Sequence, residues 1–196
     1  MRLLWVRWGD VFSLSLNLAK KIAESGYVPD IVVGILRGGY IVGRIISDAL
    51  ARPIAAVEVK FYKGIGSRGT KPIITQPIMA DMAGKKVLIV DDVVESGRTL
   101  EVVTELCSIR GASGVRTAAL YVKPWAMMNP DYYAAKVEEW VVFPWEVGET
   151  LRELRQEGES LAQAMRRLGA PYDEETASIL EAIERASANS GGGEGG

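Results

Sequence analysis

The 196-residue chain is predicted to fold as an α/β protein built around a mainly parallel sheet. Short continuous apolar runs alternate with segments of helical apolar spacing, which is typical of parallel strands covered on both faces. Two of these runs lead directly into polar, glycine-containing turns, and sheets of this class bind ligands beyond the carboxyl ends of their strands. Hydrophobic residues make up 48% of the chain, which supports a packed core.

Each element before residue 147 is predicted from its local pattern. Helices are expected where apolar residues recur every three or four positions, and strands where apolar or β-branched residues run without interruption. In chain order we expect a helix over 11–25, a strand over 29–35, a helix over 40–50, a strand over 54–62, a strand over 85–92, a helix over 98–111, a strand over 115–124 and a short strand over 140–146.

Particular residues mark the ends of these elements. Asp10 is expected to cap the first helix, Gly26 to end it and Pro29 to bound the strand that follows. Gly111 is expected to close the helix that begins at residue 98. The basic, glycine-rich segment 63–72, KGIGSRGTKP, is predicted as a loop.

The pattern changes after Gly148. The following segment is predicted as two or three short charged helices, broken at Gly158 and at 169–171, and the final residues, SANSGGGEGG, as a flexible tail. The predicted domains are a core with its last strand over 1–147, a helical extension over 148–187 and a tail over 188–196.

Composition excludes several classes of site. The chain has no histidine and its only cysteine is Cys107, so one chain cannot form a disulfide, a Cys/His zinc site or a Ser-His-Asp or Cys-His triad. Acid-base chemistry must therefore use carboxylates, Lys, Tyr or the substrate itself. A metal would be a hard cation bound through oxygen, such as Mg²⁺.

Charge and hydropathy indicate the setting in which the protein works. The formal net charge of −2 gives no indication of nucleic-acid binding through a basic surface. No apolar run approaches the roughly 18 residues of a membrane helix, and the start, MRLLWVRWGD, lacks the features of a signal peptide. We expect a cytoplasmic protein with neither a nucleic acid nor a membrane as partner.

The stretch VLIVDDVVESGRTL, residues 87–100, carries the clearest chemical signal. Its apolar run leads into Asp91 and Asp92, whose paired carboxylates require partners such as sugar hydroxyls or a cation with its waters. The glycine-containing turn 95–99 then precedes a helix, where main-chain N–H groups suit a phosphate. Together these features describe a site for a ribose 5-phosphate. A lone pair of aspartates would more often only end a strand and cap the next helix.

This stretch resembles the 5-phosphoribosyl-1-pyrophosphate (PRPP) motif of type I phosphoribosyltransferases, and residues 10–146 resemble that family's purine-salvage branch. The resemblance implies a Rossmann-like core with a small base-binding hood. It implies that Asp91 and Asp92 face the ribose hydroxyls, directly or through water bound to Mg²⁺. It also implies that the 5'-phosphate is held by Glu95, Ser96, Gly97, Arg98 and Thr99.

Residues 34–43, GILRGGYIVG, resemble the pyrophosphate loop of the family, although an ordinary strand-to-helix turn has a similar composition. The resemblance implies a non-proline cis peptide at Leu36–Arg37. It implies pyrophosphate contacts from Leu36, Arg37, Gly38 and Gly39. The loop 63–72 stands where relatives have a mobile lid, and its cations Lys63, Arg68 and Lys71 suit closure over a polyanion.

The segments YVKPW, PDYY and WVVFPWE resemble the base-binding hood of 6-oxopurine enzymes, especially the bacterial xanthine-guanine kind. The resemblance implies that Lys123 donates to the purine O6, that Trp140 stacks on the ring and that the main chain of Val141 contacts the N1–C2 edge. Glu146 would hold a second Mg²⁺ and the pyrophosphate. Each aromatic could instead belong to the core.

One residue departs from the family pattern. Glu95 stands where the 6-oxopurine branch usually has an aspartate that accepts the N7 proton. Glutamate is one methylene longer and must come within about 3 Å of N7 to act as the base. The catalytic residues implied by the resemblance are therefore Glu95, Asp91 and Asp92.

The resulting hypothesis is a Mg²⁺-dependent purine phosphoribosyltransferase of purine salvage. It transfers the 5-phosphoribosyl group from PRPP to N9 of guanine, hypoxanthine or xanthine, giving the nucleoside 5'-monophosphate and pyrophosphate. The resemblance favours a homodimer or homotetramer. Two alternatives stay open at the level of sequence, namely adenine as the base and a PRPP-sensing, nucleic-acid-binding regulator.

Overall fold

The computed structural model describes residues 2–63, 70–154 and 158–190. The chain divides into two compact units. One unit is formed by Gly9–Glu138 and the other by Met1–Trp8 together with Glu139–Gly196, and they are described in turn.

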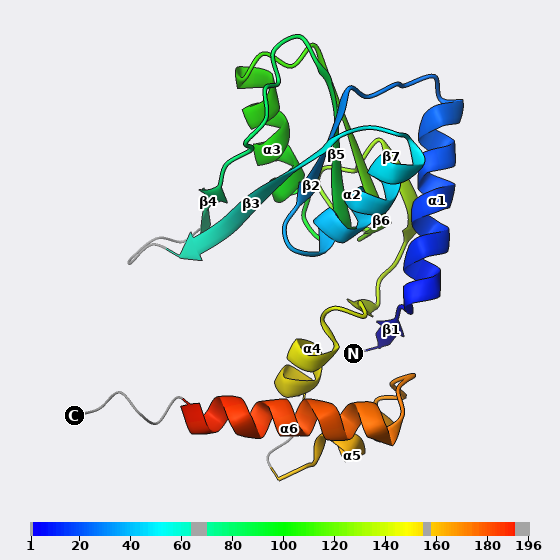
Figure 1. Ribbon diagram of the computed structural model, residues 1–196, viewed down its shortest axis with the longest axis vertical. Coiled ribbons are helices and arrows are strands. Elements are labelled where there is room, and N and C mark those ends of the chain that lie inside the picture. Colours follow the sequence, from blue (N-terminus) through cyan, green and yellow to red (C-terminus); the bar gives the residue numbers. More distant parts are fainter. Residues whose placement is uncertain (1, 64–69, 155–157, 191–196) are drawn as a thin grey trace, which may run out of the picture. The chain divides into compact units, whose positions relative to one another are not determined.

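The unit Gly9–Glu138 is built on a six-stranded sheet with the strand order β4-β3-β2-β5-β6-β7 (Figure 1). All neighbouring pairs are parallel except β3 and β4, which are antiparallel. This confirms the predicted α/β class. The strands are β2 Ile31–Ile35, β3 Ile54–Lys63, β4 Thr70–Gln76, β5 Lys86–Val94, β6 Gly114–Val122 and β7 Tyr132–Lys136, and the helices are α1 Trp8–Glu24, α2 Gly38–Ala49 and α3 Arg98–Ile109.

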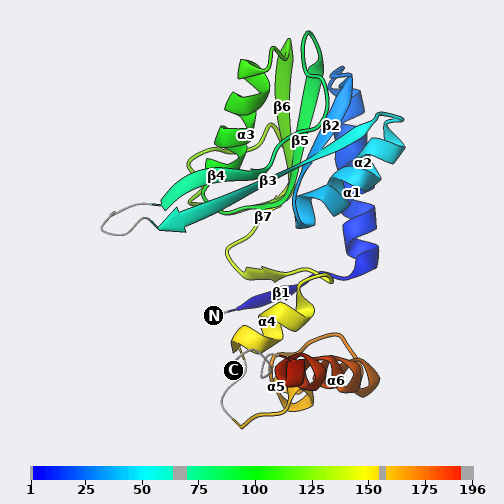
Figure 2. The ribbon, with the colours of Figure 1, turned by 60° about the vertical axis from the view of Figure 1, so that its left-hand side comes forward.

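Helices cover both faces of this sheet. Alternate residues of a strand point to opposite sides, so each strand contributes side chains to the core on both faces. On one face Val33 and Ile89 share a core cluster with α3, through Leu100, Val103 and Cys107. On the other face Gly43 of α2 packs on the strands, since a Cβ at this position would lie 3.4 Å from the Cα of Gly34 and 3.5 Å from the Cβ of Val90. Figure 2 shows α3 across the sheet from α1 and α2.

Two predicted boundaries in this unit are wrong. Helix α1 begins at Trp8, so Asp10 is not its N-cap but lies in its first turn, where a carboxylate still complements the helix dipole. Strand β5 does not end at the aspartate pair but continues to Val94, because its pairing with β6 continues through Val93 and Val94.

Two edge strands were not predicted. Strand β4 was expected as loop up to residue 72, and its Pro72 is tolerated because an edge strand has one side without a ladder partner. Strand β7, YYAAK, has neither an apolar run nor clear alternation. Both strands form by pairing with a longer neighbour, β3 and β6 respectively.

A cluster around Asp131 fixes the entrance to β7. Its carboxylate accepts hydrogen bonds from the Thr117 amide at 2.8 Å, from the Thr117 hydroxyl at 2.9 Å and from the Arg116 guanidinium. Burial raises the pKa of Asp131, but the hydrogen bonds from Arg116 and Thr117 outweigh it and hold the pKa below its usual value.

We expect Asp131→Ala to lower the free energy of unfolding by about 1–2 kcal/mol at pH 7, because it removes these hydrogen bonds. A depressed folded-state pKa means that the contribution is complete above the unfolded pKa of about 3.9 and is lost as the pH falls through the folded value. The difference between wild type and variant should therefore shrink below pH 4 in urea titrations. Asp48→Ala, which removes an exposed carboxylate, is the control and should change stability by less than about 0.5 kcal/mol. Equal effects of the two substitutions would contradict the prediction.

The second unit joins the two ends of the chain. Strands β1 Leu3–Trp5 and β8 Trp140–Val142 form a parallel two-stranded sheet, and the indole N–H of Trp5 donates to the carbonyl of Leu168 at 3.0 Å. Three helices follow, α4 Val147–Leu154, α5 Leu161–Arg167 and α6 Glu174–Ser190. The core of this unit consists of Val142, Val147, Leu151, Leu161, Met165 and Ala177.

The helices α4, α5 and α6 agree with the predicted charged helices, and the predicted breaks at Gly158 and 169–171 fall between them. The last strand is shorter than expected, ending at Val142, and Val142 packs with the helices of the extension. The two compact units divide between Glu138 and Glu139, and the predicted domain boundary after residue 147 stays a prediction. Helix α6 extends to Ser190, into the predicted tail, whereas 191–196 lie outside the described residues. Within the described ranges no helix has the length and apolar character to cross a bilayer.

Candidate active site

The two predicted phosphate-binding loops follow neighbouring strands, and the chain continues from them towards opposite edges of the sheet. Strand β2 is followed by α2 and then β3 on one side, and β5 is followed by α3 and then β6 on the other. Strands β2 and β5 are themselves adjacent and parallel. Their carboxyl ends therefore form the topological switch point at which open α/β sheets bind ligands.

The loop after β2 has the geometry expected for the predicted pyrophosphate loop. The peptide bond Leu36–Arg37 is cis, which confirms that prediction. Helix α2 begins at Gly38, and Gly39 lies directly against β5. A Cβ on Gly39 would be 2.7 Å from the Cα of Asp91 and 2.7 Å from the carbonyl oxygen of Val90, so this close approach requires glycine. The two loops therefore meet at the aspartate pair.

The aspartate pair is tied to its own strand. Asp91 accepts a hydrogen bond from the amide of Asp92 at 3.0 Å, and Asp92 accepts one from the amide of Val93 at 2.9 Å. Asp92 is buried, with 8% of the residue exposed. Two fixed carboxylates at a switch point can face a sugar diol or a cation.

These carboxylates fit a cation of the Mg²⁺ type. Within the described part of the chain, no three His, Cys, Asp or Glu side chains are grouped so that they could enclose a metal ion. Mg²⁺ is usually bound through one or two carboxylates, with substrate oxygens and waters completing its octahedron. Asp91 and Asp92 could supply the protein ligands of such a site.

The turn after β5 has the form of an anion cradle. Gly97 is the N-cap of α3 with φ of 87°, a left-handed conformation that favours glycine. The hydroxyl of Ser96 accepts from the amide of Arg98 at 3.4 Å, and the carbonyl of Ser96 accepts from the amide of Met127 at 3.0 Å. A Cβ on Gly97 would lie 2.6 Å from the carbonyl oxygen of Met128. The segment after β6 thus supports the turn from which the N-terminal amides of α3 emerge.

Lys123 and Glu95 are brought together by the register of the sheet. Val94 of β5 pairs with Val122 of β6, so Glu95 and Lys123 occupy the next positions of the two strands. The amide of Lys123 donates to the carbonyl of Val94 at 2.9 Å. The ammonium Nζ lies 3.5 Å from Oε1 of Glu95, and the Lys123 side chain is only 3% exposed, against 56% for Glu95. A buried donor therefore stands beside an accessible acceptor.

The remaining predicted base-binding residues belong to the other compact unit. Trp140 pairs with Leu3 in the β1–β8 sheet and is 45% exposed, whereas Val141 is buried. Glu146 donates its amide to the carbonyl of Phe143, and its own carbonyl accepts from the amide of Thr150, so it immediately precedes α4. The roles assigned to Trp140, Val141 and Glu146 stay predictions.

The predicted lid falls partly outside the described residues. Residues 64–69, with Arg68, are not described, whereas the main chain of Lys63 and Lys71 lies in β3 and β4. At the base of this hairpin a hydrogen bond from Thr75 holds the pKa of Glu58 below its usual value, and the charges of Lys60 and Arg37 add to the effect. The described residues on either side, in β3 and β4, pair antiparallel, and the predicted lid itself stays a prediction.

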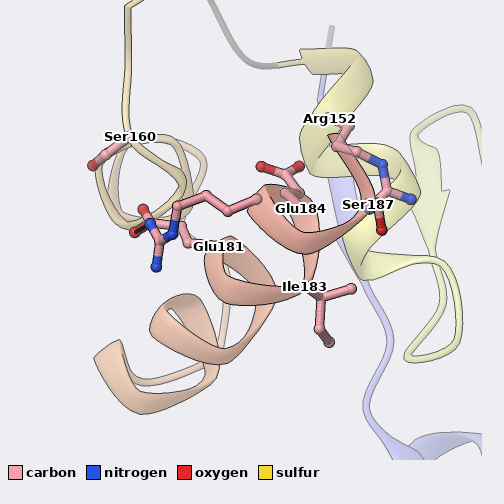
Figure 3. A pocket seen from close by; sticks show the side chains of 7 residues that line it. Arg152, Ser160, Glu181, Ile183, Glu184 and Ser187 are labelled. Carbon is pink, nitrogen blue, oxygen red and sulfur yellow. Dashed lines mark ion pairs between the residues drawn. The ribbon is translucent and has the colours of Figure 1, made fainter. Parts of the chain in front are cut away.

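A cavity of about 900 Å³ lies among the C-terminal helices (Figure 3). Its lining residues are Arg152, Ser160, Glu181, Ile183, Glu184, Arg185 and Ser187. Glu181 accepts from the amide of Leu161 at 2.9 Å and lies 3.7 Å from the Arg185 guanidinium, so its carboxylate joins α5 to α6. None of the predicted site residues lines this cavity.

Trp125 was placed by sequence in the predicted hood segment YVKPW but was assigned no role of its own. Its ring centroid is 5.5 Å from Nζ of Lys123. The hydrogen bond from the amide of Ala126 to the carbonyl of Lys123, at 3.0 Å, closes the turn that carries the indole. The sequence signal for this position is Pro124, two residues after the end of β6, because proline favours a turn there.

The part of the chain that contains these residues is similar to known proteins. A family model described as "Phosphoribosyl transferase domain" matches residues 8–150. The chain is 32% identical over 152 residues to a xanthine-guanine phosphoribosyltransferase of Cereibacter sphaeroides, covering 72% of this chain and 86% of that protein. It is 36% identical over 118 residues to the Gluconobacter oxydans enzyme of the same name, covering 59% of this chain and 67% of the relative.

Among solved structures, a purine phosphoribosyltransferase from Pyrococcus horikoshii is similar, with a TM-score of 0.68 and 43% identity. That similarity covers 74% of this chain and 94% of the Pyrococcus protein.

Proposed function

Because the chain belongs to the phosphoribosyl transferase domain family, we propose that it transfers the 5-phosphoribosyl group of PRPP to N9 of a 6-oxopurine. It is a purine phosphoribosyltransferase of purine salvage, as the xanthine-guanine enzymes and the Pyrococcus purine phosphoribosyltransferase to which it is similar indicate. The products are the nucleoside 5'-monophosphate and pyrophosphate.

The two loops at the switch point divide the work of holding PRPP. The amides at the start of α3, with Ser96, Arg98 and Thr99, suit the 5'-phosphate, since a helix N-terminus carries partial positive charge. Leu36–Gly39 lies beside Asp91 and suits the pyrophosphate. The ribose then falls between the loops, with its hydroxyls towards Asp91 and Asp92. Positioning of C1' between the departing pyrophosphate and the base supplies much of the catalysis.

The pair Lys123–Glu95 is the observation that favours a 6-oxopurine. The purine O6 accepts hydrogen bonds and the neighbouring N7–H donates one, so this edge matches a donor beside an acceptor. Nζ of Lys123 and Oε1 of Glu95 are 3.5 Å apart, a separation suited to that edge. Adenine would present its 6-amino group to the ammonium, which would leave two donors facing each other.

Glu95 is proposed as the base of the reaction. As N9 bonds to C1', the purine ring becomes more acidic and the N7 proton moves to the Glu95 carboxylate. The neutral carboxylic acid then returns the proton to solvent, which its 56% exposure permits.

Mg²⁺ is proposed to bind through Asp91 and Asp92, with PRPP oxygens and water as its other ligands. Its chemistry there is to neutralise charge on the sugar diphosphate. Binding by Glu146, a dimeric or tetrameric state and a cytoplasmic location stay predictions.

A substrate panel tests the proposal. Purified protein with PRPP and Mg²⁺ is given guanine, hypoxanthine, xanthine or adenine, and product monophosphate is measured by chromatography. We expect at least one 6-oxopurine to be used with a kcat/KM about 10²-fold or more above that of adenine, because adenine leaves buried polar groups unpaired. Turnover of adenine alone would overturn the base assignment. PRPP-dependent binding of DNA or RNA without any turnover would favour a regulator instead.

A further inference from the structure

Trp125 lies beside the buried charge that the proposed reaction uses. Its ring centroid is 5.5 Å from Nζ of Lys123, within the distance of about 6 Å at which an indole face attracts a cation. The indole is itself 57% exposed, so it is not held there as part of the core. The proposed mechanism assigns it no role.

The position of the indole is set by the fold. Lys123 immediately follows β6, and its carbonyl accepts the amide of Ala126 at 3.0 Å. This turn carries Trp125 back over the lysine side chain. Met127, which follows this turn, is also fixed, because its amide donates to the carbonyl of Ser96. The indole therefore belongs to a turn anchored on the proposed phosphate cradle.

The charge around Lys123 must change during the proposed reaction. Before proton transfer its ammonium faces the Glu95 carboxylate at 3.5 Å. When Glu95 takes the N7 proton, the carboxylate loses its charge. The Lys123 side chain is only 3% exposed, so solvent does not replace that charge. The indole face does not titrate and so attracts the ammonium in both states.

We propose that Trp125 is a positioning residue that keeps the Lys123 ammonium directed at the purine O6 before and after proton transfer, and thereby favours 6-oxopurines over 6-aminopurines. This inference rests on the proposed function. Trp125 itself need not touch the base.

Two substitutions separate the π face from simple bulk. Trp125→Leu keeps an apolar side chain but removes the ring, and we expect the KM for the preferred 6-oxopurine to rise about threefold to thirtyfold. The KM for PRPP should change by less than about twofold. Trp125→Phe keeps an aromatic face and should recover most of the lost affinity. Phe12→Leu, which changes an aromatic residue of similar exposure, 55%, on α1, is the control for an exposed ring and should leave the KM for the purine unchanged.

A double-mutant cycle tests whether Trp125 acts through Lys123. Wild type, Trp125→Leu, Lys123→Met and the double variant are compared by calorimetric titration with the product monophosphate, so that inactive variants still give a result. We expect Trp125→Leu to weaken product binding in the wild-type background and to have less than about a twofold effect once Lys123 is replaced. Circular dichroism melts of all four proteins test whether each variant is folded.

The outcomes are distinguishable. An active wild type in which Trp125→Leu leaves the purine KM unchanged, or weakens product binding equally with and without Lys123, overturns this inference alone. An equal loss in Trp125→Phe and Trp125→Leu would also overturn it, since the shape of the indole would then matter and not its π face. A folded wild type that makes nucleotide from no purine overturns the proposed function and the inference together.

Discussion

Replacing Asp92 by asparagine is expected to lower kcat/KM for the purine substrate by about 10²-fold or more, because it removes a fixed charge from the site proposed to face the ribose and Mg²⁺. The substitution is nearly isosteric. Its side-chain oxygen can still accept from the amide of Val93, which Asp92 does at 2.9 Å. We therefore expect the midpoint of urea unfolding to stay close to that of the wild type.

Steady-state kinetics at saturating PRPP and at several Mg²⁺ concentrations measure this effect. If Asp92 faces a cation, the variant should need more Mg²⁺ for half-maximal rate. Asp48→Asn is the matched control, since it removes the same charge from an exposed site on α2 where Asp48 pairs with Arg44 at 3.2 Å. Equal kcat/KM in Asp92→Asn and Asp48→Asn would refute the assignment of the aspartate pair.

Replacing Gly39 by alanine is expected to damage both stability and activity. The new Cβ would lie 2.7 Å from the Cα of Asp91 and from the carbonyl oxygen of Val90, and both atoms belong to the backbone of a central strand. Helix α2 must therefore shift away from β5, at a cost of about 1–3 kcal/mol in the free energy of unfolding. Because the shift also moves Arg37 and Gly38, we expect kcat/KM to fall by about 10²-fold.

Gly9→Ala is the matched control for this experiment. Gly9 is the second residue of α1, as Gly39 is of α2, and a Cβ there would meet nothing within 4 Å. Alanine at this helical position should stabilise the protein slightly, by up to about 1 kcal/mol. Urea unfolding and kinetics on the same preparations measure both variants. A Gly39→Ala protein as stable and active as Gly9→Ala would show that the two loops are not in close contact.

Most of the central sheet could be predicted because its strands carry their own signal. Strand β2 is buried throughout, and β5 and β6 each contain a run of at least four consecutive buried residues, so the sequences carry a signal that needs no partner to be recognised. The edge strands β4 and β7 lack that signal, since their conformation depends on hydrogen bonds to β3 and β6. For the same reason the pairing of β1 with β8, which groups the N-terminus with the C-terminal helices, was not foreseen.

The candidate site divides in the same way. The sequence by itself determined the glycine turn before α3, because such a turn is a local feature, whereas the cis peptide at Leu36–Arg37 was implied by the family resemblance. Only the tertiary structure decided that Gly39 touches Asp91 and that Lys123 stands 3.5 Å from Glu95 beneath the indole of Trp125. Those contacts arise from strand order and from the register that pairs Val94 with Val122, and neither quantity is encoded in any single segment.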